Sequence, residues 1–223
     1  MDVTLSNVKT SGEGTQSPSV VFTFDAIPEV KSIDTGVSVR YVHDLGKQWF
    51  VFRASYGRED KALNYIVGDG TYGYVAKRTT YKMINGKRTK TLESLIPNLL
   101  YVYTTEEKAY EYVTKTASLS YLTFYYNHFT LVAEKNPPLV VPTSEMENFI
   151  RATSNMNEHL LLVESAQCRF KDGERVKVIN GMFKGVEGKV ARVQGQQRVI
   201  VTISNVGLIA TAYVPSAFLQ IIE

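Results

Sequence analysis

The stretch from Arg175 to Val190 constrains the fold more than any other part of this chain. Val176 and Val178 alternate with Arg175 and Lys177, so a strand here has one apolar and one charged face. Glycines at 181, 185 and 188 then suit a tight turn and a bend at the start of the next strand. The expected strands are Arg175–Ile179, Glu187–Gln194, Arg198–Ile203 and Ile209–Val214. So small a sheet buries one face only by closing, which predicts a β-barrel over residues 170–223.

Residues 45–154 have a different pattern, in which strand-like and helix-like segments alternate. Runs rich in aromatic and β-branched residues at 47–54 and 96–103 indicate strands. Helical patterns begin near Arg58, after Thr105 as a candidate N-cap, and after Thr143 or Ser144 as the candidate N-cap of a third helix. Asn85-Gly86 predicts a hairpin within 75–91, and two further short strands are expected within 119–132. This order predicts an α+β sandwich with an antiparallel sheet.

The other two segments are expected to connect or flank these units. Residues 1–44 contain Ser11-Gly12-Glu13-Gly14 and Gln16-Ser17-Pro18, which favour a flexible tail. Residues 155–169 are expected to be a linker, within which 160–163 is apolar enough to dock. A chain of 223 residues is long enough for two domains of ordinary size.

Composition excludes several classes of protein and indicates none by itself. Hydrophobic residues make up 44% and charged residues 21%, as in ordinary globular proteins. The net charge of +3 is too small to indicate a nucleic-acid-binding protein without an uneven distribution. A single cysteine, Cys168, excludes an internal disulfide. No signal peptide is evident in residues 1–24 and no segment approaches the ~18 apolar residues of a membrane span, so we expect a cytoplasmic protein without membrane association.

Residues that could support catalysis are scattered. His43, His128 and His159 are not at metal-ligand spacing from one another or from Cys168. Asp69 lies between two glycines, where a turn residue is expected, and no phosphate-binding Gly-Lys-Ser/Thr loop is present. We therefore expect no enzymatic activity, no metal and no cofactor.

Two motifs resemble the NusG family of transcription elongation and antitermination factors. Residues 172–190 resemble a KOW motif nearly from end to end. Trp49-Phe50-Val51, the helix from Arg58 and the strand 96–102 occur in the order of the family's N-terminal (NGN) domain, although Asn98 replaces a glycine and Leu99 a tyrosine. Residues 136–150 and 210–215 are similar to UpxY-type paralogues, which act on particular polysaccharide operons. The resemblance implies an NGN-like α/β sandwich followed by an SH3-like KOW barrel.

The resemblance also implies a function. A NusG-like factor binds RNA polymerase and modulates elongation, by antitermination or pause suppression on specific operons such as surface polysaccharide operons. Expected partners are RNA polymerase, nascent RNA or upstream or non-template DNA, and a ribosome or termination factor at the KOW domain; the chain is expected to be monomeric. The alternative is a KOW protein that binds RNA or the ribosome outside transcription.

Three groups of residues are candidates for these contacts. The resemblance implies polymerase binding at Trp49, Tyr56, Pro97, Leu99, Tyr101 and Phe124, although some of these residues could equally form the core. Leu99→Asp is expected to abolish this binding and leave the fold intact. Residues 77–90 hold six basic residues and no acidic residue: Lys77, Arg78, Lys82, Lys87, Arg88 and Lys90. These residues could bind the phosphate backbone of a nucleic acid, or they could form the solvated surface of a hairpin and keep its strand edges from aggregating. On the barrel the candidates are Phe183, Lys184 and Arg192, with Phe183 alternatively a lid on the barrel core.

Overall fold

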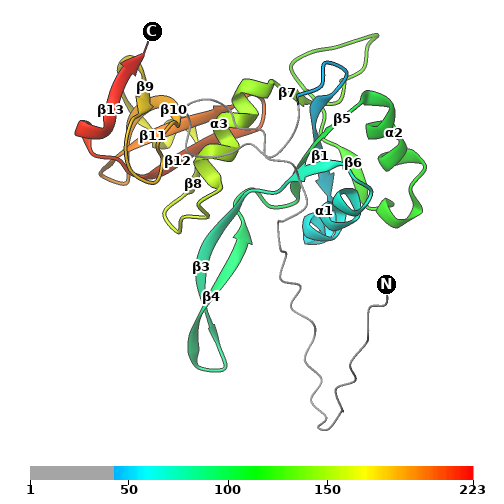
Figure 1. Cartoon of the computed structure of the whole chain (residues 1–223), viewed down its shortest axis with the longest axis horizontal. Helices are drawn as coiled ribbons and strands as arrows, with labels where there is room; N and C mark the ends of the chain where they lie inside the picture. The colour runs from blue at the N-terminus through cyan, green and yellow to red at the C-terminus, as the bar shows by residue number, and fades with distance from the viewer. Residues whose placement is uncertain (1–42, 223) are drawn as a thin grey trace, which may run out of the picture.

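The N-terminal unit is built on a five-stranded antiparallel sheet. The computed structural model describes residues 43–222 (Figure 1), so nearly all of the expected tail at 1–44 lies outside the described residues. The hydrogen-bonded order is β2-β5-β1-β6, and β7 also pairs with β1. The strands are β1 (Gln48–Ala54), β2 (Tyr72–Tyr74), β5 (Leu99–Thr104), β6 (Leu122–Phe124) and β7 (Val140–Val141).

Three helices cover the two faces of this sheet. Phe50, Phe52, Leu100 and Val102 pack with α1 (Glu59–Gly68) and α2 (Glu106–Thr114). The alternate residues of β1 and β5 pack with α3 (Thr143–Thr153) on the other face. β1 and β5 are therefore buried on both faces, which explains why their sequences are almost continuously apolar. The expected α+β sandwich is confirmed.

The helix ends were predicted with mixed success. The side chain of Thr105 caps α2 by accepting a hydrogen bond from the Lys108 N–H at 3.3 Å, as expected. The cap of α3 was predicted wrongly, because Pro142 is its N-cap residue and no side chain caps the helix. Short 3-10 helices lie at Ser55–Gly57, Ala117–Leu119, Ser165–Gln167 and Ser216–Phe218.

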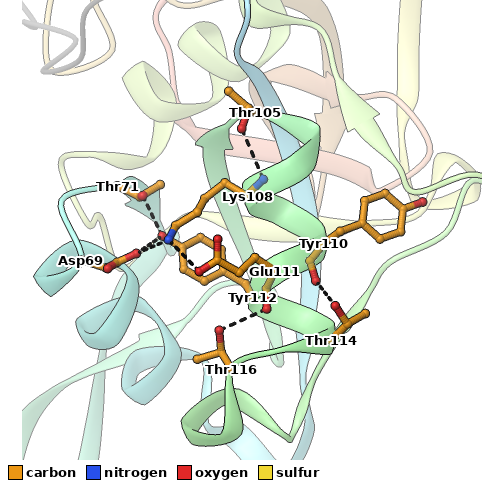
Figure 2. A network of polar contacts seen from close by, with 9 residues as sticks. All are labelled: Asp69, Thr71, Thr105, Lys108, Tyr110, Glu111, Tyr112, Thr114 and Thr116. Carbon is orange, nitrogen blue, oxygen red and sulfur yellow. Dashed lines mark hydrogen bonds and ion pairs between the residues drawn. The ribbon is translucent and has the colours of Figure 1, made fainter.

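A polar network joins the end of α1 to α2 (Figure 2). Asp69 directly follows α1, and its carboxylate lies 2.9 Å from Lys108 Nζ and accepts a hydrogen bond of 2.9 Å from the Tyr112 hydroxyl. The hydrogen bonds from Lys108 and Tyr112 lower the pKa of Asp69, while burial raises the pKa of Tyr112 to about 12. Thr71 Oγ1 lies 2.7 Å from the same hydroxyl. Asp69 therefore has a structural role at a turn.

The predicted hairpin is a two-stranded ribbon that projects from the body of the molecule (Figure 1). It consists of β3 (Lys77–Ile84) and β4 (Lys87–Ser94), which pair without interruption. Asn85 and Gly86 form the turn with φ values of 51° and 74°, the left-handed conformation for which this dipeptide is suited.

The C-terminal unit is a small antiparallel barrel with strand order β13-β9-β10-β11-β12-β8. Four strands match the prediction: β9 (Arg169–Val178), β10 (Glu187–Val193), β11 (Gln196–Ile203) and β12 (Gly207–Tyr213). Two strands were not predicted, β8 (Leu161–Val163) and β13 (Leu219–Ile222). β8 comes from the expected linker and pairs with β12.

One side of α3 faces the barrel, and its polar residues contact the barrel's turns. The Asn148 side chain donates to the Glu187 carbonyl at 2.6 Å and accepts from the Glu187 N–H at 2.8 Å. One turn earlier, the Glu145 carboxylate accepts from the Ser204 N–H and hydroxyl, both at 2.8 Å. One turn later, Arg151 donates to the Gly185 carbonyl at 3.4 Å. α3 therefore packs between the sheet and the barrel (Figure 1).

The second strand expected within 119–132 is absent from the described structure. After β6 the chain forms a loop in which Val132 and Lys135 exchange backbone hydrogen bonds of 2.8 and 3.1 Å. Ala133 and Glu134 form its turn in left-handed conformations. Phe129, Leu131 and Val132 are exposed there, so these apolar residues gave a strand-like signal without belonging to the sheet.

Candidate functional site

The six candidate polymerase-binding residues fall into three groups. Trp49, Leu99 and Tyr101 share the sheet face that α3 covers, where they are at most 7% exposed. Phe124 is also buried, but on the opposite face. Tyr56 and Pro97 are exposed at the end of β1 and the start of β5. The structure therefore does not bring the six residues together on one surface.

Two of the three residues under α3, Trp49 and Tyr101, are held by ring contacts. The Tyr101 ring centroid is 5.3 Å from that of Phe149 of α3, and Trp49 packs against Tyr72 and Tyr103 at 5.6 and 5.4 Å. Burial raises the pKa of the Tyr101 phenol. Because Leu99 is part of this core, we now expect Leu99→Asp to destabilise the fold, in contrast to the expectation from the sequence that it leaves the fold intact.

Phe124 belongs to an aromatic cluster on the other face. Its ring stacks on Phe52 at 5.2 Å and lies 4.9 Å from the Tyr110 ring of α2. Tyr126 lies 6.2 Å away and is 43% exposed, as Tyr110 is at 42%. Phe124 thus supports two partly exposed tyrosines and is itself out of reach of a partner.

Tyr56 is displayed by a turn with an unusual backbone. It has φ 62° and ψ 36°, a left-handed conformation that is costly for a bulky side chain, and its side chain is 90% exposed. The next residue, Gly57, has φ 65° and donates its N–H to Asn98 Oδ1 at 2.8 Å. Asn98 is itself at φ 65°, a left-handed conformation that asparagine adopts more readily than most residues. The hydrogen bond joins the Tyr56 turn to the turn that carries Pro97.

Arg58 extends this surface, stacked on the buried ring of Tyr121, and neither residue was predicted. The Arg58 guanidinium lies 4.0 Å from the centre of the Tyr121 ring and 5.3 Å from that of Tyr56, and its Nε donates to the Ser55 carbonyl at 3.0 Å. An arginine stacked on aromatic rings gains cation–π attraction and keeps its remaining donors free for a ligand. No local pattern indicates this contact, because Tyr121 is far from Arg58 along the chain.

The six candidate nucleic-acid-binding residues lie on the hairpin but differ in their surroundings. Lys77 pairs with Asp60 at 2.6 Å, which fixes the base of the ribbon to α1. Lys82 pairs with Glu93 at 2.6 Å, and Glu93 also lies opposite Arg78 in the ladder. Lys87, Arg88 and Lys90, in the distal half of the ribbon, are exposed and have no carboxylate partner within 4.0 Å among the described residues. The unneutralised positive charge is therefore concentrated at the distal end.

The three candidate partner-binding residues of the barrel also differ in burial and position. Phe183 is buried in the turn between β9 and β10, so it has the position expected of a lid. Lys184 is exposed in that turn, while Arg192 is exposed at the other end of β10. A groove of about 470 Å³ near the turn is lined by Phe183, Met182, Tyr213 and Phe218 among others. This groove was not predicted.

Arg198 is a buried cation that sequence reasoning did not distinguish from surface arginines. It is 4% exposed and donates to the His159 and Thr211 carbonyls, both at 2.7 Å, and to Gln196 Oε1 at 2.9 Å. Burial lowers its pKa. Because it binds a carbonyl of the expected linker, it fixes residue 159 to the barrel.

Among the side chains that the structure describes, those of residues 43–170 and 175–222, no three His, Cys, Asp or Glu gather as metal ligands. Cys168 is buried, and burial raises its thiol pKa. No helix in the same range is long and apolar enough to cross a bilayer.

Solved structures include chains that are similar to this one. No protein-family model matches the sequence, and no curated protein matches it. A solved structure titled "Domain interaction in Thermotoga maritima NusG" is similar at 20% sequence identity, covering 79% of this chain and 98% of that chain, with a TM-score of 0.39. At this level the similarity does not assign the chain to a family.

Proposed function

We propose that this protein is a NusG-like transcription factor that binds RNA polymerase through the N-terminal unit and modulates elongation. The β3–β4 hairpin contacts nucleic acid, and the barrel recruits a further partner. Support comes from two motifs in one chain: the KOW-like segment that forms β9 and β10, and the Trp49 and Leu99 strands at the centre of the sheet.

The observation that carries the proposal is the joined pair of turns that exposes Tyr56 and Pro97. Both residues were expected to bind polymerase, and they remain accessible next to each other through the Gly57–Asn98 hydrogen bond. An exposed aromatic ring on a braced turn loses little conformational entropy on binding, which favours its use as an anchor in a protein interface.

The finer proposal is antitermination or pause suppression at specific operons, such as surface polysaccharide operons. It rests on the resemblance of residues 136–150 and 210–215 to UpxY-type paralogues. Action in the cytoplasm, as a monomer, with a ribosome or termination factor at the barrel, belongs to the same proposal. Transcript mapping across operons in a deletion strain tests it, and unchanged read-through at every operon would contradict it.

Co-purification tests the main proposal. The tagged full chain should retain RNA polymerase subunits, and Tyr56→Ala combined with Pro97→Ala should reduce the retained polymerase at least about tenfold, as for loss of interface anchors. Tyr213→Ala is the control, because it removes an exposed tyrosine from the barrel. Retention of ribosomal subunits alone would favour an RNA- or ribosome-binding protein, and undiminished polymerase in the double variant would contradict the assigned surface.

A further inference from the structure

The two faces of the β3–β4 hairpin have different chemistry. Residues directly opposite in the antiparallel ladder point to the same face, and alternate pairs point to opposite faces. We name the faces after Tyr81 and Thr80. The Tyr81 face consists of Lys77, Thr79, Tyr81, Met83, Arg88, Lys90, Leu92 and Ser94. The Thr80 face consists of Arg78, Thr80, Lys82, Ile84, Lys87, Thr89, Thr91 and Glu93.

Only the Thr80 face carries a carboxylate. Glu93 lies there and pairs with Lys82 at 2.6 Å, so part of that face's positive charge is neutralised. On the Tyr81 face Lys77 is paired at the base with Asp60. Arg88 and Lys90 remain, both exposed and both without a carboxylate within 4.0 Å in the described part of the chain. The distal Tyr81 face is therefore complementary to a polyanion.

The same face exposes apolar and aromatic surface. Tyr81 is 45% exposed, Met83 69% and Leu92 53%. The Arg88 guanidinium lies 4.2 Å from the centre of the Tyr81 ring, so a cation and an aromatic plane are presented together. A ribbon whose lysines only prevent edge aggregation has no need of exposed Tyr, Met and Leu side chains among the cations.

We propose that the Tyr81 face of the hairpin binds single-stranded nucleic acid. Unpaired bases stack on Tyr81 and contact Met83 and Leu92, while Arg88 and Lys90 bind the phosphates. In a duplex the bases are already stacked on each other, so the ring and apolar side chains have little to bind and only the cations contribute. This inference rests on the proposed function, in which the hairpin contacts nucleic acid, and names the strand state that it selects.

The test compares strand states with the purified full chain. Fluorescence anisotropy would measure binding to a labelled single strand of about 12 nucleotides and to the duplex of equal length. The single strand should bind more tightly. Tyr81→Ala should weaken single-strand binding roughly 5- to 100-fold, the range for loss of one stacking ring, and Tyr81→Phe should preserve it because the ring remains.

Two lysines provide a matched control for charge. Lys90→Gln on the Tyr81 face and Lys87→Gln on the Thr80 face remove the same charge from β4. Lys90→Gln should weaken binding more. Equal losses, together with no effect of Tyr81→Ala, would overturn the inference in favour of nonspecific attraction to phosphates. Tighter binding of the duplex, or binding to vesicles of phosphatidylglycerol and phosphatidylcholine but not to the oligonucleotide, would also overturn it.

The outcome is separable from that of the proposed function. Oligonucleotide binding needs no polymerase, and polymerase retention is assigned to Tyr56 and Pro97. If Tyr81→Ala binds the single strand like the parent while polymerase is still retained, only the stacking inference fails. If the single strand binds as expected but polymerase is not retained, only the proposed function fails. Thermal unfolding of each variant checks that it is folded, as expected because Tyr81 lies outside the core clusters.

Discussion

Gly188 shows how one residue of the KOW-like motif determines local packing. A Cβ built on it would lie 2.2 Å from the Ile200 carbonyl oxygen and 2.9 Å from Val199 Cγ1. The restriction is one of space, because Gly188 has no left-handed φ. β10 and β11 can thus approach each other at this point only when residue 188 has no side chain.

Gly188→Ala is expected to destabilise the protein by about 3 kcal/mol, because the added methyl group meets backbone that cannot move without shifting a strand. Urea unfolding followed by circular dichroism measures the change. Gly68→Ala is the control, since a Cβ there has nothing within 4 Å and the position ends α1. Gly68→Ala should change the free energy of unfolding by less than about 1 kcal/mol. Similar effects of the two substitutions would contradict the packing explanation.

At the scale of elements, alternation and turn residues predicted most of the fold. Strong local signals existed for β1, β5, the hairpin and four barrel strands, and each formed. β8 and β13 are short, so their pairing depends on strands distant in the chain. In the exposed loop after β6 a strand was predicted that did not form, because the apolar residues of the loop resemble those of a strand.

For the candidate site, the sequence could not predict how exposed each side chain is. Tyr56 and Trp49 are both aromatic, but only the folded structure shows that the ring of Tyr56 is on the surface and that of Trp49 is in the core.

The Asp69 network gives the contact between α1 and α2 a pH dependence. Lys108 and Tyr112 lower the pKa of Asp69 below its ordinary value of 3.8. A carboxyl whose pKa is lower in the folded than in the unfolded state adds stability above the unfolded pKa, and this stability is lost as the pH falls through the folded pKa. Asp69→Asn should therefore lower the midpoint temperature of unfolding at pH 7. The difference in midpoint temperature between the variant and the parent should become smaller below about pH 4.

Thermal unfolding at several pH values measures this difference. Lys108→Met should reproduce the loss at pH 7, and adding it to Asp69→Asn should cost less than the sum of the single effects, because the two groups share one interaction. A difference between parent and Asp69→Asn that stays constant down to pH 2 would contradict the assigned ion pair.

At the scale of the whole molecule, α3 connects the two folded units. Its apolar residues Met146, Phe149 and Ile150 belong to a core cluster that contains residues of both the sheet and the barrel. Its polar residues Glu145, Asn148 and Arg151 bind the barrel. The barrel groups bound by this polar row are mainly backbone N–H and carbonyl groups. Docking of the barrel therefore combines apolar packing with hydrogen bonds from α3 to the backbone of the barrel's turns.

Asn148→Ala is expected to loosen this docking, because it removes both hydrogen bonds to Glu187. We expect a loss of about 1–3 kcal/mol, the cost of leaving the partly buried partners unpaired. Hydrogen exchange should show faster exchange of the Glu187 amide and of its neighbours, with little change in β1. Asn64→Ala on the exposed side of α1 is the matched control. Unchanged protection at Glu187 would show that the pair does not hold the barrel.

The hairpin has an evolutionary consequence. β3 and β4 pair only with each other among the described strands, and their distal halves pack against no core cluster. Substitutions near the tip therefore cost the fold little, whereas changes in β1 or β5 disturb both faces of the sheet. The ribbon can accumulate sequence differences while the rest of the chain is held constant by packing, so related proteins can diverge in what they recognise without diverging in how they fold.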